Sequence, residues 1–146
     1  MARASSRFVL LCTGAALLAG SLASCSSDLL NPVSHTWSLQ TVNGAPLPAT
    51  VPNSSPEIII TSGTGITSSD GSYSFSFTGT SGGTDGVVGS DQGHWSITSS
   101  TFLFRSSNGL ADYIGALNDA SLRVSLDGQV VHSTSEAIDM VFSETQ

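Results

Sequence analysis

Positive charge is scarce in this sequence. The chain has no lysine, and Arg3, Arg7, Arg105 and Arg123 are its four basic residues against eleven acidic ones, which gives a formal net charge of −7. Nucleic-acid binding depends largely on cationic side chains that neutralise phosphates, and docking onto anionic lipid depends on basic clusters. We therefore expect no nucleic-acid partner and no electrostatic attachment to a membrane.

Cysteine is almost absent as well. The chain has only Cys12 and Cys25, and both lie before residue 26. The rest of the chain has no thiol for a disulfide, a metal or a nucleophile, and without lysine it has no Ser-x-x-Lys motif. We expect stability to come from packing and backbone hydrogen bonds, and we expect the protein not to be an enzyme.

Long apolar runs are also missing, except near the N-terminus. Phe8 to Ala19 follow Arg3 and Arg7 as an apolar run, which is the layout of a secretory signal and is too short to span a bilayer comfortably. The run leads to Leu22-Ala23-Ser24-Cys25, which resembles the lipobox of bacterial lipoproteins. The resemblance implies a diacylglyceryl group on the Cys25 sulfur and cleavage of the chain before Cys25.

The lipobox divides the chain into three parts: residues 1–24 as a signal peptide, 25–34 as a polar tether, and 35–146 as the folded domain. Each buried CH₂ contributes about 0.8 kcal/mol, so two or more acyl chains would anchor the protein stably. Ser26 follows the cysteine where, by analogy with the enterobacterial sorting rule, Asp would retain the protein at the inner membrane. The expected location is therefore the cell envelope, at the outer membrane.

The domain is rich in Ser, Thr and Gly, with short apolar alternations between turn signals and no helical period. The clearest alternation places Tyr73, Phe75 and Phe77 on one face of residues 72–78, directly after the Asp70-Gly71 turn. The spacing predicts an all-β fold of about eight to ten antiparallel strands in an up-and-down meander that closes into a small barrel. A β-sandwich is the alternative, and the two differ by whether the first strand pairs with the last.

Several local expectations follow from the same patterns. Residues 36–42 form the first strand, with Trp37 and Leu39 on one face and Val42 on the other, beside Ser38 and Gln40. Further expectations are an extended loop over 45–56, a bulge or bend near Gly63 and Gly65, a glycine-rich flexible region over 80–93 around a short Val87-Val88 strand, a strand over 110–117, and a last segment that begins over 129–132.

Three motifs of the domain resemble a group of small secreted bacterial proteins with lipocalin-like architecture. The motifs are Trp37 to Gly44 with Leu47-Pro48 beyond it, Asp70-Gly71-Ser72-Tyr73, and Gly93-His94-Trp95. The resemblance implies a lipocalin-like barrel and no assigned activity. True lipocalins carry their Gly-x-Trp on the first strand, whereas here it lies in mid-chain, so no ligand site is carried over from them.

Large aromatic side chains dominate the predicted inward faces. They either fill a small barrel or line a pocket for an apolar ligand, and the short chain favours filling. They are Trp37, Tyr73, Phe75, Phe77, Trp95, Phe102, Phe104, Tyr113 and Phe142. Arg105 and Arg123 fall on outward positions, where they can pair with carboxylates; if either proves to point inward, it is the first residue to suspect of binding an acidic ligand head. The weak candidates for ligand binding are therefore Trp37, Tyr73, Trp95, Arg105 and Arg123.

Metal binding and cofactor binding are not indicated. His35, His94 and His132 are scattered, without the short spacing of zinc ligands, and are better explained as solvated or capping residues. The glycine-rich stretch from Asp85 to Asp91 lacks the dense oxygen-ligand spacing of a calcium loop. We expect no metal and no cofactor.

The sequence favours a membrane-anchored envelope lipoprotein with a non-enzymatic structural or protein-interaction role. The alternative is a lipocalin-like binding module for a small hydrophobic ligand. The expected partners are the membrane, through lipid on Cys25, and either an envelope protein or a small apolar molecule.

Overall fold

The computed structural model describes residues 34–135 and 137–145, so Cys25 and the predicted signal peptide lie outside the described residues. Short alternating segments of Ser, Thr and apolar residues form strands throughout, as their β propensity favours. The elements are β1 (His35–Val42), β2 (Ala45–Pro46), β3 (Ala49–Thr50), β4 (Ile58–Thr67), β5 (Ser72–Ser81), β6 (Thr84–Thr98), β7 (Thr101–Ser106), β8 (Tyr113–Asn118), β9 (Ser121–Asp127), the 3₁₀ helix η2 (Gly128–Val131) and β10 (Ala137–Glu144).

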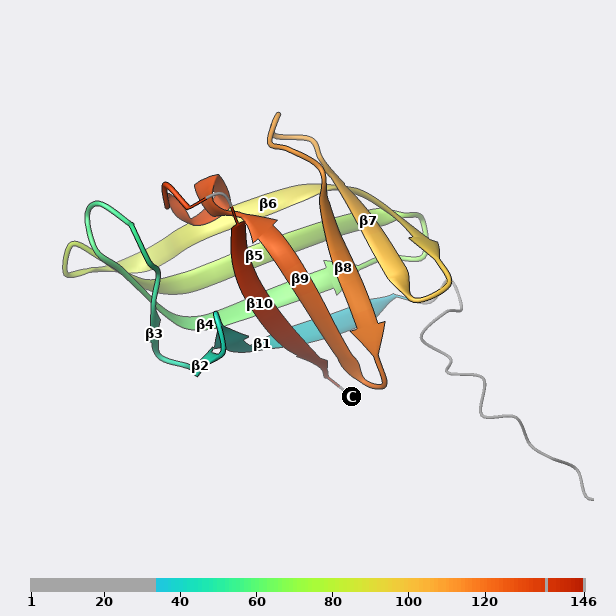
Figure 1. The fold of residues 1–146 in the computed structure, drawn as a ribbon, viewed down its shortest axis with the longest axis horizontal. Coiled ribbons are helices and arrows are strands. Elements are labelled where there is room, and N and C mark those ends of the chain that lie inside the picture. The colour runs from blue at the N-terminus through green and yellow to red at the C-terminus, as the bar shows by residue number, and fades with distance from the viewer. Residues whose placement is uncertain (1–33, 136, 146) are drawn as a thin grey trace, which may run out of the picture.

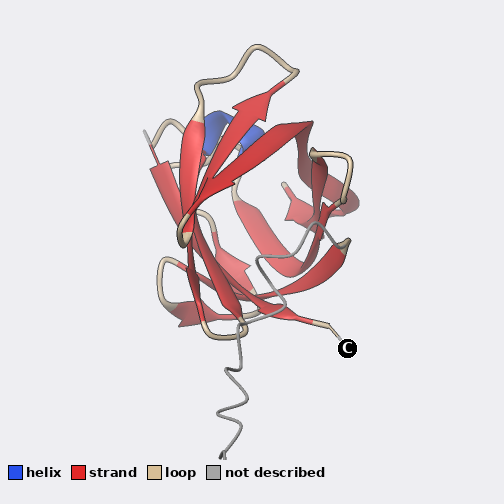
Figure 2. Ribbon diagram, turned by 90° about the vertical axis from the view of Figure 1, so that its right-hand side faces the viewer, coloured by secondary structure: helices blue, strands red, loops and turns tan. Residues whose placement is uncertain are grey.

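The strands form an antiparallel meander that closes on itself. From β4 to β10 each strand pairs with the next, and β1 pairs with β10 on one side and with β4 on the other. The circuit therefore contains β1 and β4 to β10, an eight-stranded barrel, which Figure 2 shows nearly end-on. Pairing of the first strand with the last confirms the predicted barrel and decides against the sandwich.

The barrel is flattened into two crossing layers. In Figure 1, β7 to β10 lie in front and cross the long strands β4, β5 and β6 behind them at a steep angle. The hairpin of β5 and β6 extends past the front strands at the end of the barrel where η2 lies. The turns between β4 and β5, between β6 and β7 and between β8 and β9 lie toward the opposite end, where β1 begins (Figure 1).

Inward side chains fill the space between the layers. Tyr73, Phe75 and Phe77 point inward from β5, and Phe102 and Phe104 do so from β7, as their alternation predicts. The largest fully buried side chains are Trp37, Phe75, Phe77, Phe102, Phe104, Phe142, Ile58, Ile60, Leu122, Leu126, Ile138 and Met140. At about 25 cal/mol per Å² of apolar surface, burial of these side chains is the main force that holds the barrel closed.

Two glycines of β4 make room for the aromatic rings of β5. A Cβ on Gly63 would lie 2.8 Å from the Phe77 ring, and one on Gly65 would lie 2.6 Å from the Phe75 ring. The ladder between β4 and β5 also shifts register between Ile60 and Ser62, close to the predicted bulge. Glycine at these positions lets two large rings lie flat against the neighbouring strand.

The predicted direction of the Val42 side chain in β1 is wrong. Val42 is buried, although strict alternation puts it on the outer face with Ser38 and Gln40. The reason is a register shift between Leu39 and Thr41 in the ladder with β10, where an extra residue reverses the direction of the side chains that follow. Nothing in the hydrophobic pattern of β1 marks this bulge.

The predicted flexible region over 80–93 is also wrong. Apart from the turn residues Gly82 and Gly83, its residues belong to β5 and to β6, and each from Thr84 to Gly93 except the bulged Val88 has a partner on β5. The sequence misled because Gly89 and Gly93 occupy close-packed positions, where a Cβ would strike the backbone oxygens of Val130 and Arg105. Glycine here permits close approach of two backbones rather than chain flexibility.

Three smaller boundaries also differ from the predictions. The strand expected over 110–117 begins at Tyr113, because the preceding residues form the connection from β7. The expected start of the last segment is η2, whose first backbone amides are capped by the Asp127 side chain, which accepts a hydrogen bond from the Gln129 N–H. Within the loop expected over 45–56, β2 and β3 are short ladders of two residues each.

Candidate functional site

A buried carboxylate is the strongest chemical feature of the described chain. Asp91 of β6 is 2% exposed and points inward. Its Oδ2 accepts hydrogen bonds from the Tyr73 hydroxyl at 2.6 Å and from the Tyr113 hydroxyl at 2.7 Å. The Tyr113 hydroxyl also lies 3.0 Å from that of Tyr73. Strands β5, β6 and β8 thus meet through one carboxylate.

The other oxygen of Asp91 holds the connection between β7 and β8. Its Oδ1 accepts hydrogen bonds from the Ser106 hydroxyl at 2.7 Å and from the Asn108 side-chain amide at 2.9 Å. The Ser106 oxygen in turn accepts a hydrogen bond from the Asn108 backbone N–H at 3.1 Å. With four donors on its two oxygens, the carboxylate is satisfied without a cation, which removes the main penalty of burying its charge.

The environment of this cluster keeps both tyrosines protonated. Burial raises the pKa of Tyr113 far above its ordinary value, and hydrogen bonds to Tyr73 and Asp91 add to the effect. Burial likewise raises the pKa of Tyr73, with the hydrogen bond to Asp91 as the next cause. The two phenols act as hydrogen-bond donors to the carboxylate, so the cluster joins strands rather than presenting a base or a nucleophile to solvent.

Sequence reasoning missed this cluster because it assigned Asp91 to a flexible loop. Gly89, Asp91 and Gly93 do alternate as a strand requires, and all three are buried. Hydrophobic periodicity does not detect such a strand, because its inward positions hold two glycines and a carboxylate. The signal that could have found this strand is the alternation itself: Gly89, Asp91 and Gly93 occupy every second position.

No group of three metal-ligating side chains comes together within residues 34–135 and 137–145. His35 is buried at the start of β1, whereas His94 and His132 are exposed on β6 and after η2. Asp85 and Asp91 lie on one strand, but Asp85 is exposed and Asp91 is enclosed by its donors. The structure therefore does not bring together the histidines or the carboxylates that the sequence analysis considered.

The five weak ligand-binding candidates are dispersed over the barrel. Trp37 is fully buried, and its Nε1–H donates to the Thr67 hydroxyl at 3.0 Å. Tyr73 belongs to the Asp91 cluster. Trp95 is half-buried, with its Nε1–H donating to the Ser68 carbonyl at 3.1 Å. These three side chains serve packing and strand connection.

Arg105 and Arg123, the other two candidates, are exposed on the outer face. The Arg105 Nε lies 3.6 Å from Asp112 Oδ2, and the Arg123 guanidinium makes two hydrogen bonds of 2.7 Å to Asp139. The neighbouring carboxylate raises the pKa of Arg123 above its ordinary value through a hydrogen bond and charge attraction. Both arginines point outward and pair with carboxylates, as the alternation predicts.

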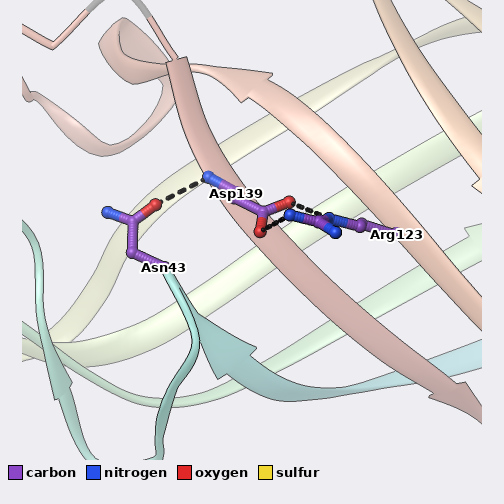
Figure 3. Close-up of polar contacts among 3 residues, drawn as sticks. All are labelled: Asn43, Arg123 and Asp139. Carbon is purple, nitrogen blue, oxygen red and sulfur yellow. Dashed lines mark hydrogen bonds and ion pairs between the residues drawn. The ribbon is translucent and has the colours of Figure 1, made fainter.

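Asp139, the partner of Arg123, is also hydrogen-bonded to Asn43 in the first turn of the barrel (Figure 3). Asn43 accepts a hydrogen bond from the Asp139 N–H through its side-chain oxygen at 2.9 Å, and its own N–H donates to the Asp139 carbonyl at 2.6 Å. Asn43 and Gly44 both have positive φ, 49° and 78°, as the predicted Asn-Gly turn requires. These two hydrogen bonds attach the turn to β10, the strand that pairs with β1.

A buried polar group lies where β1 pairs with β10. The His35 ring is 7% exposed, and its Nδ1 lies 2.6 Å from Glu144 Oε1, while its Nε2 has no hydrogen-bond partner within the described ranges. The contact joins the first residue of β1 to the last residue of β10.

The serine-rich composition produces one match to a nucleophile motif. Residues 79–83 read Gly-Thr-Ser-Gly-Gly, which fits Gly-x-Ser-x-Gly. In α/β-hydrolases that motif lies on a turn from a strand to a helix, whereas Ser81 here directly precedes the two-residue turn between β5 and β6. The match arises from the turn composition of a β-hairpin.

Five hollows on the described surface have volumes of 230 to 430 Å³, and each is open to solvent. One of about 240 Å³ lies between β6, the connection from β7 to β8, and η2. Its walls are Val87, Gly89, Ser90, Asn108, Leu110, Gln129, Val130 and His132. Another, of about 230 Å³, lies on the outer face beside Ile114 and the ion pair of Arg123.

Comparison of the chain with protein-family models, with curated proteins and with solved structures gave no match. Among the described residues, no helix has the length and apolar character needed to cross a membrane.

Proposed function

We propose that the protein is a lipoprotein of the bacterial cell envelope, anchored through Cys25, whose barrel acts through its outer surface in a structural or protein-interaction role. The lipobox Leu22-Ala23-Ser24-Cys25 after a basic start and an apolar run supports the anchor. Ser26 supports an outer-membrane destination. The proposed role of the barrel itself requires no cofactor and no catalysed reaction.

The filled interior of the barrel is the observation that supports a role for the outer surface, because a filled interior leaves no room for a ligand. A carrier for a small hydrophobic molecule needs interior space of a few hundred Å³, lined by apolar side chains. Here the inward positions hold large side chains such as Phe75, Phe104 and Phe142, each at most 1% exposed. The Phe75 ring lies 5.4 Å from the Phe104 ring and 5.3 Å from the Phe142 ring, centre to centre. Rings at these distances favour an interior that serves stability.

The length of the tether keeps such a barrel near the membrane. Nine residues separate Cys25 from His35, where β1 begins. The ten residue steps from Cys25 to His35 span at most about 35 Å. The barrel would then present its outer face to other envelope components within this short range.

Intact-mass measurement of the membrane-extracted protein tests the anchor. We expect a chain that begins at Cys25 and carries the mass of a diacylglyceryl group, and we expect Cys25→Ala to abolish the adduct. Cys12→Ala is the matched control, because Cys12 lies in the predicted signal and its loss should leave the adduct unchanged. A soluble, unlipidated product with another N-terminus would refute the anchor.

Organic extraction of the purified protein tests the surface role against the carrier. We expect no stoichiometric small molecule in the extract, and no binding of an apolar fluorescent dye to the native barrel. A bound molecule released only on unfolding would contradict the proposal and favour the carrier.

A further inference from the structure

Strand β6 is longer than the neighbour on one of its sides. Its residues Thr84 to His94 pair with β5, but β7 pairs only with Gly93 to Thr98. The Gln92 carbonyl accepts a hydrogen bond from the Ser107 N–H, and Gly89 lies against the backbone of Val130. Before Gly89, no described strand lies along this edge of β6. The barrel therefore has an open strand edge over residues 84–88.

The hairpin turn decides which backbone groups face this edge. Gly82 and Gly83 both have positive φ, 57° and 83°, which is typical of a two-residue hairpin turn that makes the flanking Ser81 and Thr84 a hydrogen-bonded pair. Pairs in an antiparallel ladder alternate between bonded and non-bonded. Asp85 and Val87 are therefore in non-bonded pairs, and each directs its N–H and C=O toward the open edge.

A hollow with both aliphatic and polar walls lies beside the edge. Val87 is 68% exposed, although it is a large apolar residue. It forms one wall of the hollow of about 240 Å³, in which Leu110 and Val130 are the other aliphatic side chains. A strand added along β6 would set alternate side chains on this side of the sheet, where one of them could enter the hollow.

Charge at the edge favours a basic occupant over a second copy of the chain. Asp85 is exposed at the edge. The two arginines of the described chain lie elsewhere, on the outer faces of β7 and β9. A second copy has a net charge of −7 and would place another acidic edge here, whereas a segment with Lys or Arg would meet Asp85 favourably.

We propose that the open edge of β6 is a docking site for an extended segment of a partner protein, which adds as a strand beside Asp85 and Val87. The segment places an apolar side chain against Val87 and Leu110 and a basic one near Asp85. Backbone hydrogen bonds supply affinity, and the hollow and the carboxylate supply specificity. This inference rests on the proposed protein-interaction role and does not depend on the lipid at Cys25.

Selection of peptides from a random heptapeptide library against the purified protein tests the site. We expect the selected peptides to alternate apolar and polar residues and to contain Lys or Arg. Val87→Pro removes an N–H that faces the open edge and leaves the ladder to β5 intact, so we expect it to weaken binding of the synthesised peptides at least about tenfold. Asp85→Lys reverses the charge and should weaken binding to a similar degree.

Two controls separate loss of the site from loss of the fold. Ile114→Ala removes an exposed apolar side chain on β8, away from the edge, and should leave peptide binding unchanged. The Val87→Pro and Asp85→Lys variants should keep the circular dichroism spectrum and a cooperative unfolding transition. If Val87→Pro does not fold, Asp85→Lys and the amide measurement below decide whether peptides bind at the open edge of β6.

Amide hydrogen exchange reports the geometry directly. On addition of a selected peptide, the amides of Asp85 and Val87 should become protected, because they gain partners in the new strand. The amide of Gly86 should change little, since Gly86 is in a bonded pair with Gly79 of β5.

Several outcomes would overturn the inference. One is a library that yields no peptide above background, and another is a set of peptides that bind both variants as well as the original chain. A dimer that Val87→Pro dissociates would show that a second copy occupies the edge. Lipidation and peptide binding are measured separately, so failure of the anchor at Cys25 would leave the docking result intact, and failure of docking would leave the anchor intact.

Discussion

At the scale of single residues, Asp91 shows how a buried charge is accommodated without a basic partner. The described chain has two arginines, both exposed on the outer face, so neither guanidinium reaches Asp91. Four neutral donors take the place of a basic partner: Tyr73, Tyr113, Ser106 and Asn108. Hydrogen bonds to a charged group contribute more than those between neutral groups, about 1.5–3 kcal/mol each, which offsets the cost of removing the carboxylate from water.

The cluster predicts a specific response to alkaline pH. The chain has two tyrosines, and both donate to Asp91, with pKa values raised above the ordinary value of 10.0 mainly by burial. The folded state retains these protons, whereas the unfolded state releases them near pH 10. The stabilisation is therefore fully present below pH 10 and declines as the pH rises above it.

Near-ultraviolet absorbance of tyrosinate checks this response. We expect no tyrosinate signal from the native protein above pH 10 until it unfolds, and ordinary titration near pH 10 in denaturant. Urea unfolding between pH 8 and 11 should show the free energy of unfolding falling with pH, with a smaller slope for Tyr113→Phe. Reversible titration of a tyrosine near pH 10 in the folded protein would contradict the buried cluster.

At the scale of elements, glycine positions decide how closely strands approach one another. Gly79 and Gly86 are partners in the ladder between β5 and β6, yet their surroundings differ. A Cβ on Gly79 would lie 1.9 Å from the Ile59 carbonyl oxygen, whereas one on Gly86 would have no atom within 4 Å. The same residue type is a steric requirement on β5 and is replaceable on β6.

Alanine substitution at these two glycines tests the difference. Gly79→Ala forces β4 away from β5, so we expect the free energy of unfolding to fall by about 3 kcal/mol. Gly86→Ala fills open space and should change it by no more than about 0.5 kcal/mol. Urea unfolding of the two variants provides the measurement, and equal effects would show that the close approach of β4 to β5 is not as described.

At the scale of the whole molecule, aromatic packing joins the two layers of the barrel. Phe75 of β5 lies 5.4 Å from the Phe104 ring of β7 and 5.3 Å from the Phe142 ring of β10, so one side chain connects the back layer to the front. Phe75 is 1% exposed. Without disulfides, closure of the barrel depends on such contacts and on the seam between β1 and β10.

Phe75→Ala tests this dependence. Loss of a buried ring with its contacts should lower the free energy of unfolding by about 3–5 kcal/mol. Ile114→Ala, at a residue that is 59% exposed, should change it by no more than about 0.5 kcal/mol. A cost below about 1 kcal/mol for Phe75→Ala would mean that the interior is loosely filled, which would reopen the possibility of an interior ligand.

Local patterns of the sequence were sufficient for the fold class and for much of its detail. Alternation placed Phe75 and Phe104 inside and Arg123 outside, and the Asn43-Gly44 pair marked a turn with positive φ at both residues. These features depend on side-chain period and turn chemistry within a few residues. The lipobox and its lipid at Cys25 are equally local, and they stay a prediction because they lie outside the described residues.

Only the tertiary structure decided the features that depend on distant partners. Burial of Val42 follows from a bulge against β10, and the strand through Gly89 and Gly93 depends on backbones that approach from η2 and β7. The Asp91 cluster and the open edge of β6 likewise arise from which strands meet and where β7 stops pairing. Local patterns in the sequence identified most of the strands and the side chains on their apolar faces, but not the first half of β6. Packing determined which strands enclose the Asp91 carboxylate and which part of β6 has no neighbouring strand. Both features depend on contacts between residues that are far apart in the chain.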